Sequence, residues 1–161
     1  MVDDDDCVVA YTDGSCNRHD KTGGWAFTAQ LGSRLITRYG CADDTTNNEM
    51  ELTAIHRLLE FVMPTPRKLI IWADSRYCLD ALTKWWRKWE RQGWTTATGA
   101  DVKNLALIHS CACYILTHEE YRILDWRYVR GHSGNPGNER VDKLADEARR
   151  QKLTNWTGGN H

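Results

Sequence analysis

Two apolar runs of this chain each end on an aspartate. In both runs the residues after the aspartate indicate a turn or the start of a helix. The first is VVAYTDGS, Val8 to Ser15, and the second is KLIIWADS, Lys68 to Ser75. The second run has an apolar centre without alternation, which is typical of a strand buried on both faces. If the two strands are parallel neighbours, Asp13 and Asp74 lie together at the sheet edge where open α/β folds bind ligands. From the first run alone, an aspartate that only starts a turn is the simpler interpretation.

The rest of the chain carries alternating signals for strands and helices. The tight turn Gly32-Ser33 joins two runs into a hairpin, so that the first three strands form an antiparallel meander. Apolar residues at helical spacing predict the helices. The expected strands are Cys7 to Tyr11, Trp25 to Leu31, Arg34 to Cys41, Lys68 to Ser75 and Tyr121 to Val129, and the expected helices are Asn48 to Met63, Arg76 to Gly93, Val102 to Thr117 and Glu139 to Lys152. This order predicts an α/β fold with a mixed five-stranded sheet, in which strands four and five are parallel, flanked by helices.

The length and the composition of the chain fit one globular domain with a single core. The chain has 161 residues, of which 41% are hydrophobic and 27% charged, as in ordinary soluble globules. No apolar run approaches the ~20 residues that a membrane-spanning helix needs, and the acidic start MVDDDDC is unlike a signal peptide. We expect an acidic tail over residues 1–6, one domain over 7–152 and a flexible tail over 153–161, in a cytoplasmic monomer.

Six cysteines are present without a C-x-x-C pair. Because nothing in the sequence indicates secretion, free and mostly buried thiols are the expectation, rather than disulfides or a structural zinc site.

Two helices offer further carboxylates that can join Asp13 and Asp74. Glu51 continues the apolar stripe of its helix, whereas Glu49 falls on the wet face. An acid on a buried stripe needs a partner, although a side chain that reaches out to water is an equal alternative. Asp142 follows Val141 near the start of the last helix, where acids are also favoured by the helix dipole alone.

Four carboxylates from four separate elements favour a two-metal site. Hard oxygen ligands suit Mg²⁺, or Mn²⁺ as a substitute, and two such ions serve phosphodiester cleavage. His132 stands in the glycine-rich loop GHSGNPGN just before the last helix, where an imidazole could transfer a proton near neutral pH.

A basic and tryptophan-rich segment, KWWRKWERQGW, runs from Lys84 to Trp94. The overall net charge of −1 hides this local excess of cations, because four acids lie in the N-terminal run. Cations attract phosphates and aromatic faces pack on sugars or bases. Trp85 and Trp89 share one helix face, and we expect Trp85 to contact nucleic acid and Trp89 and Trp94 to pack.

Together these motifs resemble type 1 ribonuclease H. The segments that carry the resemblance occur in the family's order and span nearly the whole chain: YTDGSC, TTNNEMEL, ADSRY, KWWRKWERQGW and GHSGNPGNERVDKLA. The resemblance implies the ribonuclease H fold with a Trp-rich basic protrusion. It also implies that two Mg²⁺ ions are held by Asp13, Glu51, Asp74 and Asp142, and that His132 assists proton transfer or product release. The implied reaction is endonucleolytic hydrolysis of the RNA strand of RNA–DNA hybrids, which leaves 5′-phosphate and 3′-hydroxyl ends.

The resemblance also implies where the hybrid is held. Recognition of the 2′-hydroxyl distinguishes RNA from DNA, and the turn at Cys16 and Asn17 is expected near RNA hydroxyls. Asn47 and Asn48 are expected in the minor groove and Thr46 at a DNA phosphate. The remaining expected substrate contacts are Arg76, Trp85 and Lys88.

Three alternatives remain open at this point. An integrase, transposase or resolvase relative would use the same fold on DNA, a non-catalytic module would bind hybrids without cutting them, and a reverse transcriptase could contain this sequence as a domain. The TTNNEMEL segment and the tryptophan-rich segment disfavour the first alternative, and the presence of all four acids disfavours the second.

Overall fold

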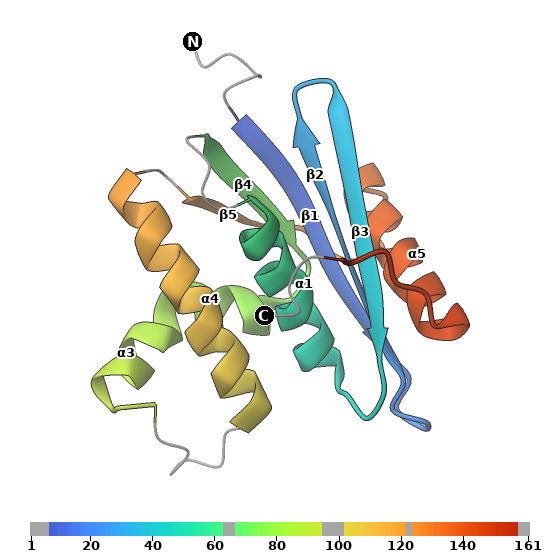
Figure 1. Cartoon of the computed structure of the whole chain (residues 1–161), viewed down its shortest axis with the longest axis horizontal. Coiled ribbons are helices and arrows are strands. Elements are labelled where there is room, and N and C mark those ends of the chain that lie inside the picture. The colour runs from blue at the N-terminus through green and yellow to red at the C-terminus, as the bar shows by residue number, and fades with distance from the viewer. Residues whose placement is uncertain (1–6, 63–66, 95–101, 122–123, 158–161) are drawn as a thin grey trace.

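The computed structural model describes residues 7–62, 67–94, 102–121 and 124–157. Its centre is a five-stranded sheet in the order β3-β2-β1-β4-β5 (Figure 1). The three N-terminal strands pair antiparallel, whereas β4 is parallel to β1 and β5 is parallel to β4. The strands are β1 Cys7–Cys16, β2 Gly23–Leu31, β3 Arg34–Ala42, β4 Lys68–Ala73 and β5 Leu124–Tyr128. The predicted mixed sheet is therefore confirmed.

Helices cover both faces of the sheet (Figure 1). On one face, α1 and α4 enclose the main core together with β1, β2 and β4, and on the other α5 packs on a smaller cluster around Ala26 and Val141. The helical elements are α1 Asn47–Val62, α2 Arg76–Asp80, the π-helical turn η2 Ala81–Trp85, α3 Trp86–Arg91, α4 Val102–Tyr121 and α5 Pro136–Gln151. No helix in the described part of the chain is long and apolar enough to cross a membrane.

The tryptophan-rich segment is anchored by a residue that periodicity did not single out. Trp86 is 1% exposed and belongs to the main core, whereas Trp85 is 38% exposed. Trp89 and Trp94 are partly buried against the same core, as expected for packing residues. The helix predicted from Arg76 is present. It contains the π-helical turn η2, which lies between α2 and α3 without a gap in the helical residues.

Several element boundaries differ from the prediction; the fifth strand, for example, begins at Leu124, because α4 continues to Tyr121 where the strand was expected to start. Two of the differences bear on the acids. β1 continues to Cys16 because it stays paired with β2, whereas its pairing with β4 stops at Thr12 opposite Ala73. Asp13 is thus the first residue beyond the parallel pairing and not the last of a strand. The last helix begins at Pro136, because Asn135 caps it by accepting a hydrogen bond from the backbone of Asn138 at 3.0 Å.

Residues 153–157, which belong to the predicted C-terminal tail, contact the sheet. The amide nitrogen of Asn155 donates to the Tyr39 carbonyl at 3.1 Å, and the Tyr39 amide donates back to the Asn155 side chain at 2.7 Å. Trp156 then packs edge-on against Trp25 and Phe27. This segment crosses the edge of β3 toward α1 (Figure 1) and so covers an otherwise open strand edge. The predicted acidic tail and residues 158–161 lie outside the described residues.

Replacing Trp156 by alanine is expected to lower the free energy of unfolding by about 2 kcal/mol, since a half-buried aromatic anchor is lost. Urea unfolding measures this as a lower midpoint with an unchanged slope. Trp85→Ala is the matched control, because its ring is exposed and should cost much less stability. Equal losses in the two variants would contradict the anchoring role of Trp156.

Candidate active site

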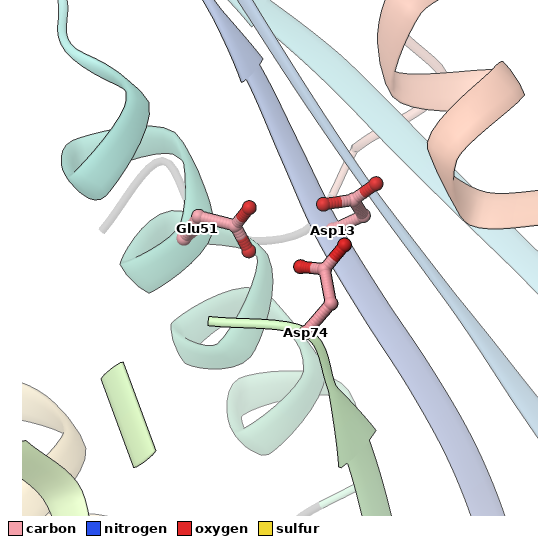
Figure 2. A group of neighbouring side chains, drawn as sticks. All are labelled: Asp13, Glu51 and Asp74. Carbon is pink, nitrogen blue, oxygen red and sulfur yellow. The ribbon is translucent and has the colours of Figure 1, made fainter. Parts of the chain in front are cut away.

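Three acidic side chains from three elements meet at one point of the sheet edge. Asp13 comes from β1, Glu51 from α1 and Asp74 directly after β4, and each offers an oxygen within 4.8 Å of the others (Figure 2). The parallel pairing of β1 with β4 brings the two aspartates together, as the two apolar runs predicted. Carboxylate oxygens gathered in this way match the ligand preference of hard divalent cations.

The approach of α1 to β1 depends on the glycine that follows Asp13. A Cβ atom on Gly14 would lie 2.4 Å from the backbone nitrogen of Glu51 and 2.5 Å from the carbonyl carbon of Met50. Only a residue without a side chain therefore lets the first turns of α1 rest on the strand and carry Glu51 to Asp13. The Gly14 amide also donates to Asp13 Oδ1 at 2.8 Å, which orients that carboxyl group.

Asp13 and Glu51 are buried acids with unsatisfied oxygens. They are 2% and 4% exposed, and Asp13 Oδ2 and Glu51 Oε2 make no hydrogen bond within the described residues. Burial is the main reason that the pKa of Asp13 is raised to about 8; a proton shared with Glu51 opposes the rise, and the charge of Asp74 adds to it. Burial and the neighbouring Asp13 likewise hold the pKa of Glu51 well above its usual range. These orphaned oxygens call for a cation or for shared protons.

Asp74 and Asp142 complete the acidic lining of an open groove. Burial raises the pKa of Asp74, and the nearby Asn138 opposes the rise. Asp142 lies in α5 beyond its first turn, is half-buried and adds to the raised pKa of Asp13, but it is outside the tightest group of three. The groove has a volume of about 370 Å³ and is lined by Asp13, Gly14, Ser15, Cys16, Asn47, Glu51, Asp74, Ser75, His132 and Asp142.

His132 lines this groove from the loop between β5 and α5. Its side chain is exposed and its backbone has a φ of +58°, a left-handed conformation that is uncommon outside glycine. The imidazole is therefore presented to solvent at the rim and does not pack in the core. Of the other histidines, the rings of His56 and His109 contact Tyr114 and Trp94, respectively.

A second, larger hollow adjoins the acidic groove. It has a volume of about 510 Å³ and shares Cys16 and Asn47 with the groove. The remaining residues that line it are Arg18, Lys21, Thr45 and Thr46. Sequence reasoning missed the two cations, although their position in the turn between β1 and β2, directly after the acid-bearing strand, was an available signal.

Comparison with known proteins decides the family. The sequence profile of RNase H matches residues 5–150, nearly the whole chain. The chain belongs to the RNase H family. It is 39% identical to Ribonuclease H of Alcanivorax borkumensis over 86% of this chain and 89% of that protein. It is also 39% identical to Ribonuclease H of Novosphingobium aromaticivorans, over 88% of this chain and 95% of that protein.

A solved structure supports the same assignment. The chain matches the crystal structure of LC9-RNase H1, described as a type 1 RNase H with the type 2 active-site motif, with a TM-score of 0.79 and 26% identity. The match covers 96% of this chain and 77% of that one. The resemblance to type 1 RNase H is thus confirmed, and the protein is a nuclease of a metal-dependent family.

The substrate contacts expected at the start of α1 and in the turn after β1 lie in or beside the two hollows. Thr46 is exposed and its hydroxyl accepts a hydrogen bond from the Glu49 amide at 3.1 Å, so that it also caps α1. Asn47 is exposed and lines both hollows, and Asn48 is half-buried beside it. Asn17 instead uses its side-chain oxygen within its own turn, where it accepts from the His19 amide at 2.8 Å.

The other expected contacts lie on the side of α2 and α3. The Arg76 guanidinium stacks over the exposed Tyr128 ring at 4.1 Å, close to where Asp74 leaves the sheet. Trp85 is exposed, with its ring 5.8 Å from Tyr77 and 6.0 Å from Trp89. Lys88 is exposed in α3. The structure therefore leaves all three expected contacts exposed, and none of them is among the residues that line the acidic groove.

Proposed function

We propose that this RNase H is an endoribonuclease that hydrolyses the RNA strand of RNA–DNA hybrids, leaving 5′-phosphate and 3′-hydroxyl ends. Membership of the family supports the reaction class. The single observation that carries the proposal is the convergence of Asp13, Glu51 and Asp74 in an open groove, where Asp13 Oδ2 and Glu51 Oε2 are buried and make no hydrogen bond within the described residues.

We propose that the cations held here are two Mg²⁺ ions, with Mn²⁺ as a substitute. The donor set fits, because it consists of carboxylate oxygens without a nitrogen or sulfur ligand in the tightest group. Asp13, Glu51, Asp74 and Asp142 would hold the ions. When bound, such a pair supplies an activated water and stabilises the leaving oxygen of a phosphodiester. The bare protein must otherwise keep protons on its buried acids, as the raised pKa of Asp13 indicates.

His132 is proposed to move a proton or to help release the product at the groove rim. Because it does not belong to the acidic floor, His132→Ala should lower kcat about 100-fold without abolishing cleavage, at the lower end of the range typical of a general acid or base. Single-turnover and steady-state rates on the same hybrid separate a chemical role from a role in release. Unchanged rates in both assays would contradict a role of His132 in proton transfer and in product release.

The substrate strands are proposed to lie across both hollows. Arg18 and Lys21 place positive charge beside the exposed Thr46 and Asn47, next to the acidic groove. Cations at this point suit a phosphate of one strand, while the groove takes the strand that is cut. The exposed Trp85 and Lys88 would contact the DNA strand farther away. Binding should weaken with salt in proportion to the number of phosphates that these cations neutralise.

A cytoplasmic monomer is proposed as the working form. No disulfide joins the cysteines, all of which lie in the described part of the chain. Only Cys78 and Cys111 of the six are buried, so the expectation of mostly buried thiols is wrong. Free thiols suit a reducing compartment. The elements of one chain supply each acid of the groove, so the proposed chemistry requires no second copy.

The experiment uses labelled duplexes of one sequence as RNA–DNA, RNA–RNA and DNA–DNA, each with Mg²⁺ and with EDTA. The proposal predicts cutting of only the RNA strand of the hybrid, lost in EDTA. Binding of the hybrid without cutting would favour the non-catalytic module. Cutting of the DNA duplex would favour a DNA nuclease on the same fold, and the metal assignment would then survive without the substrate.

A further inference from the structure

A second set of polar contacts joins α5 to β1 beside the acidic groove. The Arg149 guanidinium donates to Asp146 Oδ1 at 2.8 Å, and its Nε donates to Ser15 Oγ at 3.3 Å. The Ser15 hydroxyl completes the set by donating to Asp146 Oδ1 at 3.5 Å. We call these three residues the Arg149 bridge. The bridge ties together segments that lie more than a hundred residues apart in the sequence.

The bridge residues lie on the same two elements as two of the acids, β1 and α5, and on the same sides of them. Asp146 follows Asp142 by one helical turn, so both lie on the same side of α5. Ser15 follows Asp13 by two residues, so both lie on the same face of β1. Two pairs of residues therefore lie opposite each other between β1 and α5. Asp13 lies opposite Asp142 in the groove, and Ser15 lies opposite Asp146 in the bridge.

The backbones are in close contact at the bridge. Ser15 pairs with Gly24 of β2, and a Cβ atom on Gly24 would lie 2.2 Å from the Ala145 carbonyl oxygen and 2.7 Å from the Arg149 nitrogen. The side chain of Arg149 is 15% exposed, so this cation is largely enclosed between helix and sheet. By contrast Arg150, which also binds Asp146 at 2.9 Å, is 62% exposed.

We propose that Arg149 is a positioning residue that acts through Ser15 and Asp146 to hold Asp142 in place toward Asp13 for divalent cations. This inference rests on the proposed metal site. Asp13 and Asp142 belong to the two elements that the bridge ties together, β1 and α5. Because Ser15 and Asp146 lie just beyond these acids and Arg149 contacts both, the bridge fixes the distance between the strand and the helix that carry the ligands.

A purely electrostatic role of Arg149 makes the opposite prediction. An enclosed cation close to a metal site repels the metal, so its removal would strengthen Mg²⁺ binding. The positioning role predicts weaker binding, because second-layer partners of ligands typically contribute 10–100-fold to metal affinity. The sign of the change therefore separates the two roles.

The test is calorimetric titration of the full chain with Mg²⁺, in the absence of nucleic acid. Arg149→Met keeps most of the aliphatic stem and removes the guanidinium, and Ser15→Ala removes the other end of the bridge. We expect each to weaken Mg²⁺ binding about tenfold. Arg149→Lys should recover part of the loss, since it keeps the charge but not the forked geometry. Arg150→Met is the matched control and should bind Mg²⁺ as the wild type does.

Hybrid cleavage provides the second readout. The Mg²⁺ concentration for half-maximal cleavage should rise by the same factor in Arg149→Met and Ser15→Ala, while the rate of Arg149→Met at saturating Mg²⁺ stays near that of the wild type. Unchanged or tighter Mg²⁺ binding in Ser15→Ala and Arg149→Met, or an equal loss in Arg150→Met, would overturn the positioning role alone. A wild type that binds no Mg²⁺ would overturn the proposed metal site as well.

Discussion

Asp13→Asn is expected to lower hybrid cleavage in Mg²⁺ by at least about a thousandfold. The substitution removes the charge at the centre of the acidic group, and a direct ligand should cost more than the 10–100-fold typical of second-layer partners. The measurement is single-turnover cleavage of a labelled hybrid at saturating enzyme. Glu49→Gln is the matched control, because Glu49 is a carboxyl group of α1 that does not line the groove. A rate near that of the wild type for Asp13→Asn, or an equal loss for Glu49→Gln, would contradict the assignment.

The same variant should be more stable than the metal-free wild type at neutral pH. Because burial raises the pKa of Asp13 from 3.8 to about 8, the folded protein binds more protons than the unfolded chain between these values. The contribution of Asp13 to stability is thus present below about pH 4 and declines as the pH rises to about 8. Denaturant titrations in EDTA should show this decline in the wild type and a smaller one in Asp13→Asn. Identical pH profiles would show that the charge on Asp13 is not destabilising.

Gly14→Ala is expected to damage both stability and activity. The added methyl group would lie 2.4 Å from the backbone nitrogen of Glu51, and backbone atoms cannot turn aside as a flexible side chain can. We expect a loss of about 2–3 kcal/mol in the free energy of unfolding, as for overpacking. Because α1 must move away from β1, Glu51 leaves its position and cleavage should fall about a hundredfold, the cost of a small misplacement of a catalytic group.

Trp156→Ala separates these two effects of Gly14→Ala. It should lose comparable stability far from the groove, and under conditions where both variants are folded it should keep wild-type cleavage. Urea unfolding establishes the folded fraction, and the hybrid assay is then run at that condition. Gly14→Ala with full activity would show that the close approach of α1 is not needed to place Glu51.

The sheet and three of the acids were predictable because their signals are local. An apolar run that stops at an acid indicates a strand end, and this placed Asp13 beside Asp74. Helical periodicity alone selected Glu51 over Glu49, and the structure shows Glu51 buried. The predicted ends of the strands were wrong where pairing with another strand determines them. For example, β1 continues to Cys16 because it stays paired with β2.

Other features depend on contacts that no local pattern contains. Trp85 and Trp86 are chemically equal neighbours, yet only the packing of α4 and the core buries Trp86. The tail lacks periodicity, but Asn155 has matching partners on β3. The Arg149 bridge likewise joins residues 134 positions apart, so only the fold reveals that the last helix is tied to β1.

The most direct test of the central claim is to locate the ions by anomalous scattering in crystals of the wild type soaked with Mn²⁺ in the presence of a hybrid that it cannot cut. The account predicts two Mn²⁺ peaks in the groove, ligated by oxygens of Asp13, Glu51, Asp74 and Asp142, beside a phosphate of the RNA strand. Mn²⁺ bound only elsewhere on the molecule, or a DNA-strand phosphate at the acids, would contradict it.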